Sequence, residues 1–107
     1  MPSQINNKNK FKAKIFKALS DPVRLSILDF LRDGEKCVCE IIPHVKRIQP
    51  VVSRHLKILK DSGIVIDRKE GNRRLYSITE PQIFRIIDGV TPELANTFTK
   101  RIIEQIA

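Results

Sequence analysis

The sequence has few of the features that several large classes of protein require. It contains two cysteines, Cys37 and Cys39, which cannot supply the four ligands of a zinc finger. No apolar run approaches the ~20 residues that span a bilayer, and the polar N-terminal residues lack the apolar centre of a signal peptide. We therefore expect a cytoplasmic protein without a membrane partner, in which thiols stay reduced.

Catalytic motifs are also missing from the sequence. It shows no set of nucleophile, base and acid, no glycine-rich phosphate loop and no catalytic metal motif. It contains no internal repeat and no low-complexity segment. We therefore predict one domain over residues 8–107 that is not an enzyme and needs no obligatory cofactor, preceded by a disordered arm over residues 1–7.

Positive charge is what the sequence has in excess, and it is concentrated. The net charge is +8, and residues 44–76 hold nine Lys and Arg against three acidic residues. Residues 1–20 add five lysines and no acidic residue. A basic block of this kind beside nearly neutral flanks favours a polyanionic partner such as nucleic acid.

Apolar periodicity predicts helices over much of the chain. The expected helices cover about 8–19, 22–33, 38–46, 50–61, 80–88 and 92–106. Asp21 followed by Pro22 is a typical helix start, because aspartate caps and proline needs no amide partner there. Pro43 predicts either a regular helix that starts near Ile41 or a kinked first turn, because an internal proline loses a backbone hydrogen bond.

The segment that follows the fourth helix has the pattern of a hairpin. Residues 64–68 and 74–78 alternate apolar and polar side chains, and Glu70-Gly71-Asn72 between them is a turn signal. Two helices joined by a short turn and followed by a basic hairpin indicate a winged helix-turn-helix. The predicted fold class is therefore mainly α with a small β-hairpin.

Three motifs in this arrangement resemble the ArsR/SmtB family of small dimeric repressors. They are LSDPVRL at residues 19–25, VSRHL at 52–56 with Leu59-Lys60 and Gly63, and DRKEG at 67–71. The arsenic-responsive branch is most similar, because Cys37-Val38-Cys39 occurs together with Gln49-Pro50. The resemblance implies a homodimer built by the first and last helices, and both carry apolar stripes larger than a small domain needs. A dimer goes together with a palindromic operator in double-stranded DNA.

The fourth helix and the hairpin are the predicted DNA-reading elements. The major groove admits one helix, whose N-terminal half reaches base edges while flanking basic side chains contact the DNA backbone. The side chains expected at the groove are Gln49, Val51, Ser53, Arg54 and His55. Those expected at phosphates or an adjacent minor groove are Lys57, Lys60, Lys69, Arg73 and Arg74. The alternatives are solvated lysines, a packing role for His55 and an ion pair for Arg68.

The cysteine pair predicts a chemical trigger. On a regular helix Cys37 and Cys39 would lie about 200° apart, so one soft ion could bind both only on loosened backbone. The resemblance implies As(III) or Sb(III) as the effector, and another soft metal ion is an alternative. Ile42 stands where the best-known members have a third cysteine. The missing ligand could be a small thiol, water or hydroxide, and His44 is a remote candidate about 140° around the helix from Cys39.

Other functions stay open at this stage. The cysteines could form a thiol-redox or persulfide switch, or could be inert packing thiols. An oxidised form is expected to use another thiol, because a direct Cys37–Cys39 disulfide closes a very small ring. Residues 90–107 contain no His, which argues against the zinc-sensing pattern of the family. A winged-helix module that binds protein rather than DNA is the alternative from a different class.

Overall fold

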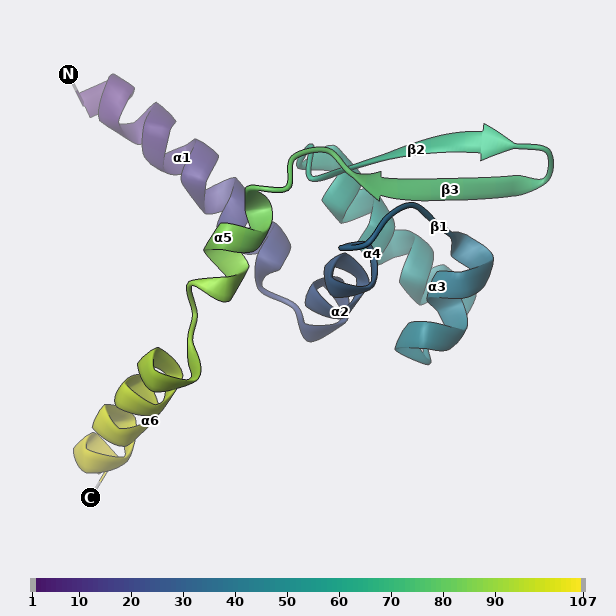
Figure 1. Cartoon of the computed structure of the whole chain (residues 1–107). Helices are drawn as coiled ribbons and strands as arrows, with labels where there is room; N and C mark the ends of the chain where they lie inside the picture. The colour runs from purple at the N-terminus through teal and green to yellow at the C-terminus, as the bar shows by residue number, and fades with distance from the viewer. Residues whose placement is uncertain (1, 107) are drawn as a thin grey trace.

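The computed structural model describes the backbone of residues 2–106 and the side chains of residues 7–106. Its elements are α1 (Pro2–Leu19), α2 (Pro22–Phe30), β1 (Lys36–Cys37), α3 (Val38–Val45), α4 (Gln49–Asp61), β2 (Val65–Glu70), β3 (Arg73–Ile78), α5 (Ile83–Asp88) and α6 (Pro92–Ile106). The predicted class, mainly helical with a small antiparallel sheet, is confirmed. Figure 1 shows a central body of α2, α3, α4 and the sheet, from which α1 and α6 project on the side opposite the hairpin tip.

The helix starts follow the local sequence closely. The Asp21 carboxylate accepts hydrogen bonds from the backbone N–H groups of Val23 (2.7 Å) and Arg24 (3.2 Å), which caps α2 as predicted. Helix α3 ends at Val45 because Lys46 adopts the left-handed conformation, with φ of 54°. Only residues 46–48 separate α3 from α4, so the two helices form a helix-turn-helix.

The sheet contains one strand more than the sequence predicts. Strands β2 and β3 form the expected hairpin, in which Val65 pairs with Ile78 and Glu70 pairs with Arg73. The two residues of β1 add a third strand beside β3, in the order β1-β3-β2. A strand of two residues has no detectable periodicity, which is why sequence patterns missed it. Its effect is to fix Cys37 opposite Leu75 at the base of the hairpin.

One helix begins earlier than expected, and another is regular across an internal proline. Helix α1 includes residues 2–7, which were expected to form a disordered arm, and Met1 lies outside the described residues. The third helix was expected over 38–46, and α3 starts at Val38 within that range, so the alternative of a start near Ile41 is wrong. Pro43 has no backbone N–H, so the hydrogen bond to the carbonyl of Cys39 is missing. So short a helix tolerates the loss of this one bond. The division into arm and domain stays a prediction.

The core lies between α2, α3, α4 and the base of the hairpin. Its fully buried side chains are Ile27, Leu28, Leu31, Ile41, Val52, Leu56, Leu59 and Val65. Helix α6 contributes no buried residue, and among the described residues no helix is long and apolar enough to cross a membrane. The core therefore positions the helix-turn-helix and the hairpin, whereas α6 stands apart from it.

Candidate nucleic-acid interface and cysteine site

Helix α4 has one buried face and one exposed basic face. Leu56 and Leu59 are at most 1% exposed and hold the inner face against the core. Gln49, Ser53 and Arg54 are exposed on the N-terminal half, and Arg54 makes no ion pair among the described residues. Val51 is half-buried. The geometry leaves the first two turns of α4 available for a DNA groove.

His55 is the predicted groove residue that the structure turns inward. Its side chain is only 12% exposed, and its Nδ1 lies 3.1 Å from Nη1 of Arg24. Because arginine can only donate, Nδ1 accepts this hydrogen bond and the ring proton lies on Nε2. Arg24 is itself buried and donates to the carbonyl oxygens of Ala18 (2.7 Å) and Lys17 (3.1 Å) at the end of α1. His55 therefore joins α4 to α2, and through Arg24 to the end of α1, which matches the packing alternative.

Lys60 and Arg74 share one carboxylate between α4 and the hairpin. Lys60 Nζ lies 2.9 Å from Asp67 Oδ1, and Arg74 Nη1 lies 2.6 Å from Asp67 Oδ2. Hydrogen bonds from Lys60, which has the larger effect, and from Arg74 hold the pKa of the Asp67 carboxyl below its ordinary value. The Asp67 side chain is 8% exposed, whereas both cationic side chains are about half exposed. Asp67 thus fixes two predicted phosphate contacts and was not singled out from the sequence.

The hairpin tip carries the other predicted backbone contacts. Arg73 is half exposed and has one weak partner, Glu40, at 3.5 Å, and Lys69 makes no ion pair among the described residues. Arg68 pairs with Glu35 and Glu70, each at 2.8 Å, so the ion-pair alternative holds for Arg68. On α4, the exposed Lys57 pairs with Asp61 at 3.1 Å. Surface pairs of this kind are weak and exchange readily for phosphate.

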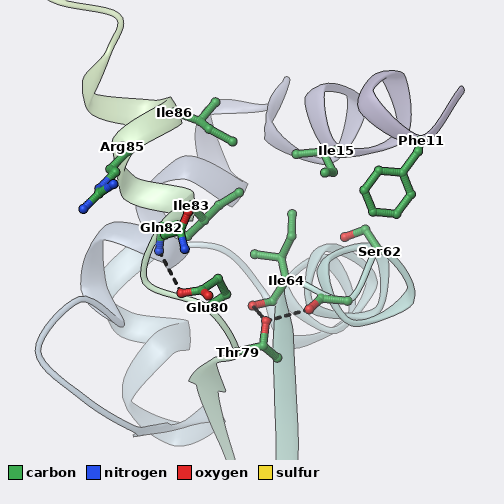
Figure 2. Close-up of a pocket in the computed structure, with 11 residues that line it drawn as sticks. Phe11, Ile15, Ser62, Ile64, Thr79, Glu80, Gln82, Ile83, Arg85 and Ile86 are labelled. Atoms are coloured by element: carbon green, nitrogen blue, oxygen red, sulfur yellow. Dashed lines mark hydrogen bonds between the residues drawn. The ribbon is translucent and has the colours of Figure 1, made fainter. Parts of the chain in front are cut away.

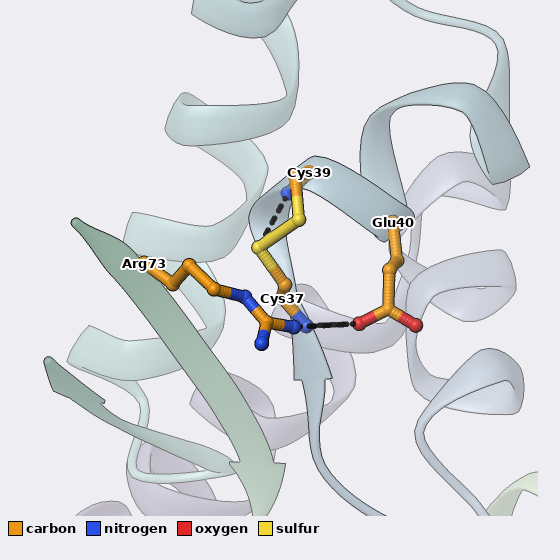
Figure 3. Close-up of a disulfide and its surroundings, with 4 residues drawn as sticks. All are labelled: Cys37, Cys39, Glu40 and Arg73. Carbon is orange, nitrogen blue, oxygen red and sulfur yellow. Dashed lines mark hydrogen bonds and ion pairs between the residues drawn. A yellow bond between two sulfur atoms is a disulfide. The ribbon is translucent and has the colours of Figure 1, made fainter. Parts of the chain in front are cut away.

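The two cysteines are joined to each other in the structure. A Cys37–Cys39 disulfide links the end of β1 to the first turn of α3, with the two Cα atoms 5.0 Å apart (Figure 3). This corrects the expectation that oxidation would involve another thiol. Cys37 is the N-cap of α3 in extended conformation, so the pair is not on opposite faces of a helix. The helix boundary, and not Pro43, brings the sulfurs together.

Glu40 ties the cysteine site to the hairpin. Its Oε1 accepts a hydrogen bond from the backbone N–H of Cys37 at 3.0 Å and lies 3.5 Å from Nη2 of Arg73 (Figure 3). Glu40 thereby completes a capping box at the start of α3. The spacing of Glu40 three residues after Cys37 is a capping-box signal that the sequence already contained, although cysteine is an unusual cap.

Ligands beyond the two sulfurs are scarce at this site. The His44 ring stacks on Phe30, with centroids 3.9 Å apart, so it is engaged away from the sulfurs. Ile42 packs against the core. Within residues 7–106, no group of three or more His, Cys, Asp or Glu side chains could hold a metal ion. A soft ion at the reduced pair would therefore need a third donor from outside the chain.

The apolar surfaces of the terminal helices are exposed. Phe11 and Phe16 of α1 are 68% and 58% exposed, and Phe98 of α6 is 60% exposed. A cavity of about 410 Å³ lies where α1 meets α5, and Phe11, Ile83 and Ile86 are among its lining residues (Figure 2). Exposed apolar area on this scale marks an interaction surface.

The sequence is similar to known transcriptional regulators. Residues 21–67 match the family described as "Bacterial regulatory protein, arsR family". An uncharacterized HTH-type transcriptional regulator of Methanocaldococcus jannaschii is 50% identical over 76 residues, which cover 70% of this chain and 85% of the relative. An arsenical resistance operon repressor of Staphylococcus aureus is 38% identical over 89 residues, or 83% and 84% of the two chains.

Solved structures show the same fold. The homodimeric winged helix-turn-helix DNA-binding domain Mb0332 of Mycobacterium bovis has a TM-score of 0.72 and 28% identity, and the match covers 95% of this chain and 90% of that one. The transcriptional repressor BigR of Xylella fastidiosa has a TM-score of 0.71 and 29% identity over 84% and 92% of the chains. The winged helix-turn-helix fold is therefore shared with a DNA-binding domain and a transcriptional repressor.

Proposed function

The chain belongs to the ArsR family of transcriptional repressors, and from this premise we propose that it binds a palindromic operator as a homodimer and leaves it when a thiophilic ion binds Cys37 and Cys39. The observation that carries the DNA-binding part is the exposed basic face of α4 beside the hairpin. Gln49, Ser53 and Arg54 are exposed at the N-terminal end of α4, where base edges are read. Lys57, Lys60, Lys69, Arg73 and Arg74 supply the phosphate contacts.

Two features support a dimer. Phe11 and Phe16 of α1 and the apolar stripe of α6 are exposed in the subunit, and the similar Mb0332 domain is homodimeric. Two recognition helices about 34–36 Å apart would then read the two halves of a palindrome. Helices α1 and α6 project on the side of the molecule away from the hairpin tip, so a dimer built by them would leave the hairpin free for DNA.

The effector part rests on the place of the cysteines at the start of the helix-turn-helix. Only the reduced pair can bind an ion, because a disulfide has no thiolate to offer. As(III) and Sb(III) favour three thiolates, of which this chain supplies two, and a small thiol or hydroxide would complete the set. Binding would move Cys37 and the first turn of α3, and the effector would thereby favour a state that fits DNA less well.

The disulfide favours a second candidate, a thiol-redox repressor. In that case oxidation of Cys37 and Cys39, and not an ion, would change the affinity for DNA. The two candidates share the DNA-reading surface and differ only in the trigger. A protein-binding module without DNA contacts is a third candidate, and it predicts no loss of affinity for a promoter fragment as salt rises.

The test is DNA release, measured by fluorescence anisotropy, with arsenite, antimonite, cadmium, zinc and an oxidant added in turn. We expect arsenite and antimonite to release the reduced protein at the lowest concentrations. The double variant Cys37→Ser with Cys39→Ser should bind DNA and resist release. Release of that variant by arsenite would remove the cysteines as the sensor, and release of the wild type by oxidant alone would favour the redox candidate.

A further inference from the structure

A second cavity lies between the cysteine pair, the start of α4 and the hairpin. Its volume is about 470 Å³, which is within the range of sites for small ligands. Cys37 and Cys39 line it together with Gln49 of α4 and Arg73 and Arg74 of β3. The cysteine pair and two arginine residues therefore border the same space.

The two sulfur-bearing residues of this cavity differ in environment. Cys37 is 2% exposed, whereas Cys39 is exposed. The Sγ of Cys37 also accepts a hydrogen bond from the backbone N–H of Cys39 at 3.0 Å and caps the N-terminus of α3. Negative charge on Cys37 would be stabilised there, because a helix N-terminus favours anions. An incoming nucleophile reaches Cys39, and Cys37 is the better leaving group.

We propose that Cys39 is a modification site, at which a low-molecular-weight anionic thiol opens the Cys37–Cys39 disulfide and stays attached as a mixed disulfide. The thiolate sulfur of the small molecule attacks Cys39 Sγ and forms a new S–S bond. The Cys37–Cys39 bond breaks, and its electron pair stays on Cys37 Sγ as a thiolate. The incoming sulfur is oxidised to the disulfide level and Cys37 is reduced, so no further oxidant is required.

Arg73 gives the site its preference for an anion. Its only ion-pair partner in the described part of the chain is Glu40 at 3.5 Å, and the Arg73 side chain is 54% exposed. It can therefore turn to a carboxylate on the incoming thiol. Arg74 is held by Asp67 at 2.6 Å and contributes positive potential from a fixed position. Thiols that carry carboxylates should react faster than cationic ones.

The modification would also affect DNA binding, and this consequence rests on the proposed function. The adduct would occupy the space beside Gln49, Ser53 and Arg73, which are proposed DNA contacts. Its negative charge would repel phosphates and engage Arg73. Attachment to Cys39 and release of DNA are separate measurements, so failure of one is distinguishable from failure of the other.

The site of attachment is tested by reacting the oxidised full-length protein with glutathione, quenching with acid, labelling free thiols with N-ethylmaleimide and mapping peptides. We expect glutathione on Cys39 and the label on Cys37. Cys37→Ser, which keeps an N-cap oxygen, should form a lasting adduct with glutathione disulfide. Its rate should be at least about tenfold above that of the matched Cys39→Ser, because Cys39 is exposed whereas Cys37 is 2% exposed and inaccessible to the disulfide. Attachment at Cys37, equal attachment at both, or no adduct in either experiment would overturn the proposal.

The anion preference is tested with glutathione, 2-mercaptoethanol and cysteamine at equal thiolate concentration. The rate ratio of glutathione to cysteamine should fall by about two- to tenfold in Arg73→Gln, because one positive charge is lost at short range. It should rise in Glu40→Gln, which keeps a capping side chain and removes the competing carboxylate. Circular dichroism checks that both variants fold. An unchanged ratio in both variants contradicts the role of Arg73.

Discussion

At the scale of the residue, Asp67 holds two basic side chains from different elements. Lys60 comes from α4 and Arg74 from β3, and both reach the same carboxylate. A carboxylate inside a basic surface lowers the total electrostatic attraction for DNA. It also holds both cationic side chains in place before DNA binds, so less side-chain conformational entropy is lost on binding. The motif at 67–71 was recognised in the sequence, but the role of its aspartate depends on a partner outside the motif.

Asp67→Asn should lower the free energy of unfolding at neutral pH by about 1–2 kcal/mol, because two charge-assisted hydrogen bonds are weakened. The pKa of Asp67 is lowered in the folded state, so its contribution is complete well above the unfolded value near 3.8. The contribution is lost as the pH falls through the still lower folded value. In urea titrations from pH 7 to pH 3, the free energy of unfolding should therefore fall less with decreasing pH for Asp67→Asn than for the wild type. Asp61→Asn, which removes an exposed partner of Lys57, is the control and should change little.

His55→Ala should lower the free energy of unfolding by about 1–3 kcal/mol, because the buried Arg24 loses the acceptor of its Nη1. Any loss of DNA affinity should be equal on all sequences, since His55 faces the core side of α4. Ser53→Ala, on the exposed face, is the control and should leave stability unchanged. A change of base preference in His55→Ala, with stability intact, would restore its predicted role in the groove.

At the scale of the element, the two halves of α4 have different roles. The N-terminal half exposes Arg54 without an ion-pair partner among the described residues, and the C-terminal half binds the hairpin through Lys60. Three buried residues, Val52, Leu56 and Leu59, prevent the helix from rotating about its axis. The exposed face is therefore fixed by the buried one.

Arg54→Ala should cost about 1–3 kcal/mol of binding free energy at one base position and should relax specificity there. Lys60→Ala should weaken binding to all sequences alike and reduce the slope of log affinity against log salt by about one. Both are measured by anisotropy on a set of single-base operator variants at several salt concentrations. Equal loss on every sequence for Arg54→Ala would show that Arg54 contacts phosphate and does not read a base.

At the scale of the whole molecule, the shape points to a missing partner. The radius of gyration is 16.5 Å, whereas a compact domain of this length has about 13 Å. The excess comes from α1 and α6, which project from the central body (Figure 1). Helix α6 buries none of its residues, so most of its apolar stripe is exposed in the isolated subunit.

Phe98→Asp should convert the dimer to a monomer, because a carboxylate would be buried at the proposed interface without a partner. Sedimentation equilibrium measures the mass, and affinity for a palindromic fragment should fall together with it. The control Thr97→Asp adds the same charge about 100° around α6 from Phe98, outside the apolar stripe, and should leave the mass unchanged. A wild-type protein that sediments as a monomer at all concentrations would contradict the dimer itself.

The sequence alone determined the class of fold, the helix-turn-helix, the hairpin and the family resemblance, because these depend on local periodicity, caps and turn residues such as Asp21 and Gly71. Tertiary structure decided which side chains meet. His55 turns inward because it meets Arg24 of α2. Asp67 binds two cations because Lys60 of α4 reaches it. The two sulfurs meet because the two-residue strand β1 holds Cys37 beside β3. Contacts between elements distant in the chain leave no periodic signal in the sequence. Residue type and spacing could therefore suggest these side chains as candidates but could not predict which residues they contact.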